Sequence, residues 1–146
     1  MATYASTTST ATVATNYHPA QLLLARILLA AVFLVAGVRK LMAPAAAAGF
    51  FAKLGMPAAD VMVWVAIIIE IGGGLMLLTG WKARYAAWLI ALFVLIATFM
   101  AHRFWEISDP GQYGNQLNHF LKNFAIIGGM LFVAACGPGS MSVDKS

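Results

Sequence analysis

The sequence predicts an all-α integral membrane protein, built as an antiparallel bundle of four transmembrane helices. Of the 146 residues, 62% are hydrophobic and 10% are charged, and the mean hydropathy is +0.83. A soluble domain carries about 25% charged residues, so this chain has too few to cover a surface exposed to water. The apolar residues fall in four blocks, each about long enough to cross a hydrocarbon layer of roughly 30 Å. Little of the chain remains outside these blocks, which indicates a single membrane domain.

The charged residues and the cysteine content exclude several classes of function. The formal charge is +4, but the nine Lys and Arg residues are scattered near the predicted helix ends, where they can reach lipid headgroups. This distribution does not indicate nucleic-acid binding. Cys136 is the only cysteine, so the chain can form neither an internal disulfide nor a Cys-x-x-Cys pair. Any redox chemistry would therefore need a bound cofactor or a partner subunit.

The N-terminal third begins with a polar tail and continues into the first predicted span. Residues 1–18 are rich in Thr, Ser and Ala and lack a charged segment followed by an apolar core. They do not resemble a signal peptide, and we expect a disordered tail. The first span, Ala20–Met42, contains Arg26 and ends with the pair Arg39 and Lys40.

Two interpretations stay open for residues 43–57, which two prolines bracket. Phe50, Phe51 and Leu54 lie at helical spacing there, which favours a short helix in the membrane interface. The alternative is an ordinary loop whose phenylalanines pack on the bundle.

The remaining elements follow in order. Apolar blocks predict the second span over Ala58–Thr79, the third over Ala83–Arg103 and the fourth over Leu117–Ala135. The intervening residues 107–116 contain Asp-Pro-Gly and further turn residues, which predicts a loop. Residues 137–146 form a polar C-terminal tail. Four antiparallel spans place both termini on one face of the membrane, but the balance of Lys and Arg does not decide which face.

The carboxylate of Glu70 lies within the strongly apolar part of the second span. Three glycines follow it closely. At a rise of 1.5 Å per residue, Glu70 lies roughly 14 Å from the terminal face, Arg26 roughly 9 Å and Asn123 roughly 18–20 Å. These side chains could therefore form one polar cluster near mid-membrane. An ionisable residue at this depth is a functional hypothesis by default. Glu70 would either stay protonated or form an ion pair with Arg26, and the sequence does not choose between these states.

A second layer of polar residues is predicted near the opposite face. Lys40, His102 and His119 fall roughly 24–30 Å from the terminal face, and Trp105 follows just outside. Lys40 is interpreted either as an end residue that reaches the headgroups or as a contact for an anionic group. The two histidines have no flanking ligand motif, so we predict no metal site.

Four motifs, taken in order, resemble the DoxX family of small bacterial membrane proteins. They are "RILLAAVFLVAGVRKL", "EIGGGLMLLTG", "HRFWE" and "KNFAIIGGML", and the resemblance covers about residues 22–132. It implies a four-helix fold in the bacterial cytoplasmic (inner) membrane. The family name comes from a membrane subunit associated with a quinol oxidase, so the resemblance also implies a role near respiratory-chain or thiol redox chemistry.

The first functional hypothesis is a redox- or respiration-associated membrane subunit that binds a quinone-like or other small amphiphilic ligand and acts with soluble or membrane partners. The candidate catalytic residues are Glu70 and His102. Ligand-binding candidates are Arg26, Lys40, Asn123, His119 and Trp105. The alternatives are a small carrier for a solute or proton and a membrane anchor for a soluble enzyme.

Overall fold

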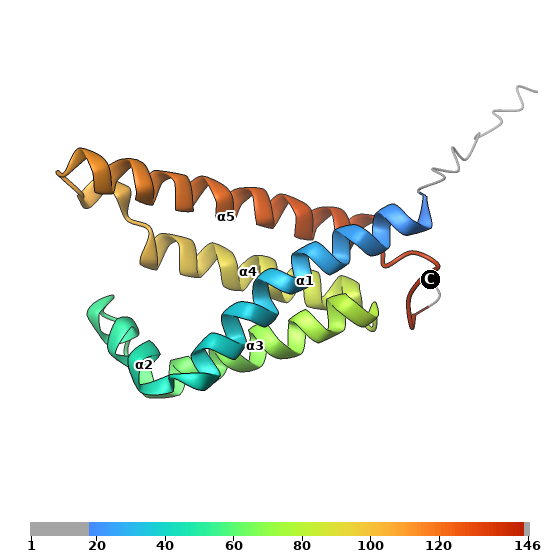
Figure 1. Cartoon of the computed structure of the whole chain (residues 1–146), viewed down its shortest axis with the longest axis horizontal. Helices are drawn as coiled ribbons and strands as arrows, with labels where there is room; N and C mark the ends of the chain where they lie inside the picture. Colours follow the sequence, from blue (N-terminus) through green and yellow to red (C-terminus); the bar gives the residue numbers. More distant parts are fainter. Residues whose placement is uncertain (1–17, 145–146) are drawn as a thin grey trace, which may run out of the picture.

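The structure is a computed structural model, and it describes residues 18–144 (Figure 1). Its helices are α1 (Pro19–Met42), α2 (Pro44–Lys53), α3 (Ala59–Thr79), α4 (Ala83–Ala101), the 3-10 turn η1 (Phe104–Glu106) and α5 (Pro110–Cys136). The described part of the chain contains no strand, which confirms the predicted all-α class. The tail predicted for the first residues lies outside the described residues, apart from His18.

The four long helices form two antiparallel pairs. Helix α1 packs along α3, and α4 packs along α5, while α3 and α4 join the two pairs. Figure 1 shows both described chain ends at the same end of the bundle, as the four-span topology predicts. Towards the other end the α1–α3 pair and the α4–α5 pair separate, and α2 lies beside α3 there.

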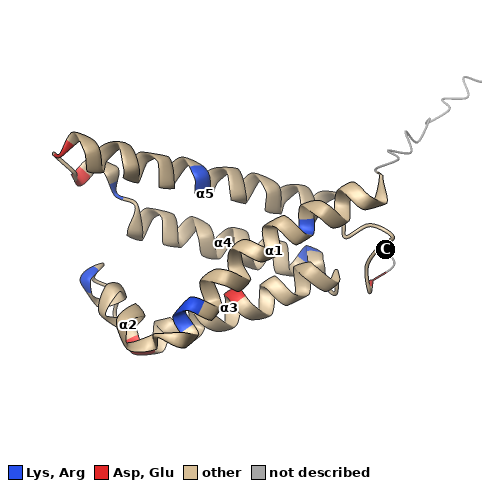
Figure 2. Ribbon diagram, in the orientation of Figure 1, with Lys and Arg blue, Asp and Glu red and all other residues tan. Residues whose placement is uncertain are grey.

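The distribution of side-chain sizes is that of a protein surrounded by lipid. Each of the four long helices is long and apolar enough to cross a membrane. The interior is built largely from small residues such as Ala30, Ala66 and Ala87, while Ile68 and Phe132 are 68% and 72% exposed on the outside. Small interior residues let membrane helices approach closely, and large apolar side chains on the outside contact lipid tails. Figure 2 shows long uncharged stretches of helix, with most charged positions towards the helix ends.

Helix α5 begins earlier than the sequence suggested. It starts at Pro110 rather than Leu117, so the predicted loop over 107–116 is wrong for residues 110–116. The side chain of Asp109 accepts a hydrogen bond of 2.8 Å from the backbone N–H of Gln112. Asp as N-cap followed by Pro at the first position is a strong helix start. The same Asp-Pro-Gly letters are also typical of a turn, which is why the pattern alone was ambiguous.

Two further segments take a definite form in the structure. Residues 44–53 are helical, as the first of the two interpretations expected, whereas the placement of this helix in the membrane interface stays a prediction. The C-terminal segment folds back onto the turn between α3 and α4. There the N–H of Val143 donates to the carbonyl of Thr79 at 3.0 Å, and the N–H of Lys82 donates to the Asp144 carboxylate at 2.6 Å.

Close approach of α1 and α3 depends on a glycine. A Cβ added at Gly37 would lie 2.7 Å from Cγ1 of Ile71 and 3.1 Å from Cβ of Glu70. Neither atom is the free end of a flexible side chain, so a larger residue would push the two helices apart. Lys40 is one helical turn further along α1, and the contact at Gly37 therefore sets its height relative to Glu70.

We expect Gly37→Ala to lower the free energy of unfolding by about 1–3 kcal/mol, because the added methyl group overpacks the α1–α3 contact. Gly72→Ala is the matched control, since a Cβ there meets no atom within 4 Å. The control should be neutral or slightly stabilising, through the better helix propensity of Ala. Unfolding in mixed micelles, followed by circular dichroism, measures both. Equal stability of the two variants would contradict the close contact.

Candidate functional site

The centre of the candidate site is an ion pair between α1 and α3. Nζ of Lys40 lies 2.8 Å from Oε1 and 2.9 Å from Oε2 of Glu70. The side chain of Glu70 is 6% exposed and that of Lys40 is 24% exposed. The ammonium group therefore neutralises the buried carboxylate and donates to both of its oxygens. Of the two states left open for Glu70, the ion pair with Arg26 is wrong, because the cation that contacts Glu70 is Lys40.

Arg26 finds its partners elsewhere, at the end of the bundle that carries the termini, although its buried Nε has none among the described residues. Its Nη1 donates to the carbonyl of Leu77 at 3.3 Å, and its Nη2 donates to the carbonyl of Met141. The residue is 1% exposed. Depth counted from the helix ends placed Arg26 near Glu70, but that estimate assumed untilted helices starting at one level. The α1–α3 register set at Gly37 instead brings Arg26 beside the last turn of α3, where carbonyl groups are free to accept.

A cavity of about 390 Å³ lies beside the ion pair, between α2, α3 and α4. Lys40 and Glu70 are the charged residues in its lining, and the other lining residues are apolar. Its walls include Phe51 and Leu54 from the α2 region, Met62 and Ile69 from α3, and Phe93 and Met100 from α4. A molecule in this cavity would meet apolar surface everywhere except at one charged pair.

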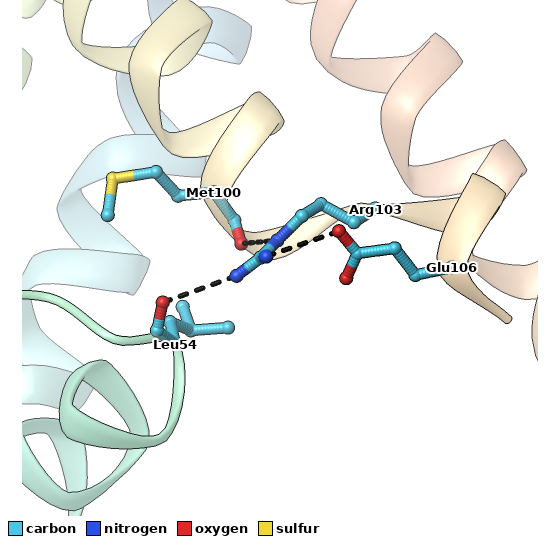
Figure 3. A network of polar contacts seen from close by, with 4 residues as sticks. All are labelled: Leu54, Met100, Arg103 and Glu106. Atoms are coloured by element: carbon cyan, nitrogen blue, oxygen red, sulfur yellow. Dashed lines mark hydrogen bonds and ion pairs between the residues drawn. The ribbon is translucent and has the colours of Figure 1, made fainter.

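Arg103 ties two walls of this cavity together at one edge (Figure 3). Its Nε donates to the carbonyl of Met100 at 3.2 Å, and its Nη2 donates to the carbonyl of Leu54 at 3.3 Å. Its Nη1 lies 3.3 Å from Oε1 of Glu106. The connection after α2 is thereby held to the end of α4. Sequence reasoning missed this role, because the acceptors on Leu54 and Met100 are backbone carbonyls that every residue possesses.

The two histidines meet at the end of α4 and the first half of α5. The rings of His102 and His119 stack with centroids 5.1 Å apart and planes 11° apart. Nδ1 of His102 lies 2.7 Å from the side-chain oxygen of Gln116. Trp105 belongs to an adjoining aromatic cluster, in which its ring lies 6.0 Å from that of Phe120. The structure therefore brings together the predicted histidine pair, but Lys40 is not part of it, and neither histidine nor Trp105 lines the cavity.

Asn123 also has a partner of its own. Its Nδ2 donates to Oγ1 of Thr98 at 2.9 Å, and that hydroxyl donates to the carbonyl of Val94 at 2.6 Å. This contact joins α5 to α4. The single mid-membrane cluster predicted from Arg26, Glu70 and Asn123 is thus wrong, because each of the three residues has different partners.

Comparison with known sequences decides the family. The DoxX family profile matches residues 21–103. The chain belongs to the DoxX family. The matched range contains Lys40, Glu70 and every residue that lines the cavity, whereas His119 and Asn123 lie outside it.

Two bacterial relatives of this DoxX protein match along most of their length. The chain is 29% identical over 128 residues to the inner membrane protein YphA of Escherichia coli (strain K12), covering 88% of this chain and 91% of the relative. It is 36% identical over 123 residues to the inner membrane protein YqjF of the same organism, covering 84% and 88%. A weaker match, 29% over 79 residues, is to a Surfeit locus protein 4 homolog of Schizosaccharomyces pombe, of which it spans 26%. No solved structure matches.

The inner-membrane relatives and the four candidate spans confirm the predicted localisation of this DoxX protein. It is a multi-pass protein of the bacterial inner membrane. The family match extends through the ion pair and the cavity, so the candidate site belongs to the part of the chain that the family shares.

The Lys40–Glu70 pair should behave as a unit. We expect Lys40→Met to lower the free energy of unfolding by about 2 kcal/mol, because it leaves a buried carboxylate without its cation. Replacing both partners, as Lys40→Met with Glu70→Leu, should cost less than Lys40→Met alone. Lys53→Met, which removes a charge outside the pair, is the matched control and should be near neutral. Additive losses in this double-mutant cycle would contradict the coupling.

Loss of the Arg103 side chain should loosen the edge of the cavity. We expect Arg103→Gln to broaden the distribution of distances between spin labels placed at residues 52 and 107, because Leu54 loses the donor that joins it to α4. Pulsed electron paramagnetic resonance in nanodiscs measures this. Lys82→Gln, at the other end of the bundle, is the control for the charge change. An unchanged distribution in Arg103→Gln would show that packing alone holds this edge.

Proposed function

We propose that this DoxX-family protein binds a small amphiphilic, quinone-like molecule in the cavity between α2, α3 and α4. The observation that carries the proposal is one ion pair, Lys40–Glu70, in the wall of an otherwise apolar cavity. Small-molecule sites typically enclose about 300–1,000 Å³ with apolar walls and a few polar groups that fix orientation. The cavity volume of about 390 Å³ lies in that range.

The hydrogen-bonding capacity of the pair suits a polar head group. The ammonium group of Lys40 has three N–H donors, of which two reach the oxygens of Glu70. The third can donate to a ligand carbonyl. The Glu70 carboxylate keeps unused lone pairs that can accept from a ligand hydroxyl. Glu70 is also the group proposed to exchange a proton with such a hydroxyl, while the apolar walls hold the ring and tail.

The role proposed for the whole protein is that of a redox- or respiration-associated membrane subunit. It rests on the DoxX resemblance rather than on the cavity, and it requires a partner that supplies or removes electrons. Of the predicted site residues, Lys40 and Glu70 carry this proposal. The other predicted site residues do not line the cavity; they are Arg26, His102, His119, Asn123 and Trp105.

The arrangement of polar groups favours a binding site over the alternative of a solute or proton carrier. A carrier needs polar stations that follow one another across the membrane. Here Arg26 bonds to backbone carbonyls, and Asn123 bonds to Thr98, so neither continues a path from Glu70.

The anchor alternative depends on a soluble partner binding near Arg103. Flux into protein-loaded vesicles and co-purification of a soluble enzyme are the corresponding tests.

Photolabelling with an azido-quinone in nanodiscs tests the proposal directly. We expect label on α2, α3 and α4, and competition by decylubiquinone. Glu70→Gln should reduce labelling about tenfold, because a buried hydrogen bond to a charged group contributes about 1.5–3 kcal/mol. Ala97→Trp, which fills the cavity and keeps the ion pair, should abolish labelling.

Glu106→Gln is the matched control, since Glu106 is exposed, outside the cavity, and paired with Arg103. It should label like the unaltered protein. If Glu70→Gln and Ala97→Trp both label normally while remaining folded, the quinone does not occupy this cavity and the proposal fails.

A further inference from the structure

A second hollow lies at the corner between α1 and α2. Its volume is about 430 Å³. It shares Lys40, Phe50 and Phe51 with the cavity between α2, α3 and α4, and its other lining residues do not line that cavity. Its floor is formed by small residues, among them Ala36, Ala43 and Ala47. Two cationic side chains, Arg39 and Lys40, line it, and no acidic residue does.

Charge is not balanced at this hollow. Within residues 18–144, the carboxylate that pairs with Lys40 is Glu70, and it lies towards the other cavity. Arg39 is exposed and has neither an ion-pair partner nor a side-chain hydrogen bond in this part of the chain. Its guanidinium group, with five N–H donors in a planar fork, is therefore free to bind an anion. Phosphate oxygens match that fork well.

The position of the hollow indicates where the anion comes from. Arg39 lies in the last turn of α1, at the end of a helix that is long enough to cross the membrane. Lipid phosphate groups lie at the ends of such helices, at the edge of the hydrocarbon layer. The alanine floor leaves room for a glycerol group and the start of an acyl chain, and Phe50, which is 52% exposed, offers an apolar wall.

We propose that the α1–α2 hollow is a binding site for an anionic phospholipid, whose phosphate contacts the guanidinium group of Arg39. A zwitterionic lipid carries a cation beside its phosphate, so it gains less from Arg39, which has no acidic partner within residues 18–144. The site can be altered without altering the proposed quinone site, because Arg39 and Ala46 line the α1–α2 hollow and do not line the other cavity.

The test is lipid retention by the full-length protein. The protein is reconstituted with equal amounts of phosphatidylglycerol and phosphatidylcholine, stripped with mild detergent, and analysed by native mass spectrometry. We expect retained phosphatidylglycerol to exceed phosphatidylcholine about fivefold, the ratio typical of one basic residue acting on an anionic lipid surface. Arg39→Gln should bring the ratio close to one.

Two further variants make the outcome decisive. Lys53→Gln removes the same charge from the end of α2 but does not line the hollow, so it should keep the enrichment. Ala46→Trp keeps every charge and fills the hollow, so it should lose the enrichment. Circular dichroism confirms that each variant is folded.

Equal enrichment in all four proteins, or equal loss in Arg39→Gln and Lys53→Gln, would show general attraction by surface charge and would overturn the site. Labelling by the azido-quinone should be unchanged in Arg39→Gln. The two proposals can therefore fail separately.

Discussion

The ion pair between Lys40 and Glu70 is the interaction on which the arrangement of this bundle depends. A carboxylate in the hydrocarbon layer is costly unless a cation reaches it. Lys40 can do so because Gly37, one turn earlier, lets α1 approach the backbone of α3. The contact at Gly37 sets the spacing and register of these two helices, and the ion pair holds them in that register. Both oxygens of Glu70 are occupied by one ammonium group, so the remaining helices need not provide a further cation.

Fixing α1 against α3 has consequences at both ends of the bundle. At the end with the termini, Arg26 reaches the last turn of α3, and the folded-back C-terminal segment provides a carbonyl for it. At the other end, the two helix pairs separate and α2 lies beside α3 (Figure 1). The cavity forms in that space. Arg103 limits the opening by joining the connection after α2 to the end of α4 (Figure 3).

Lys40 has a place in both proposed sites, and this follows from where it lies. Its side chain reaches from α1 to Glu70 on α3, and Lys40 lines both the α1–α2 hollow and the cavity. The quinone-like ligand would contact this ammonium group, whereas the phosphate of the anionic phospholipid would contact Arg39. The aromatic residues Phe50 and Phe51 line both spaces as well, so α2 contributes a wall to each of them.

The sequence by itself determined the class of protein, the number of candidate spans, their approximate bounds, the family and the unusual position of Glu70 among apolar residues. These follow from composition, apolar block length and the rarity of an acid among apolar residues, all of which are local. Only the tertiary structure decided which cation pairs with Glu70, where Arg26 and Asn123 find partners, and that Arg103 closes one edge of the cavity. Those choices depend on helix tilt, on register and on backbone carbonyls. No short stretch of sequence specifies helix tilt or register, because both are set only when all the helices pack together.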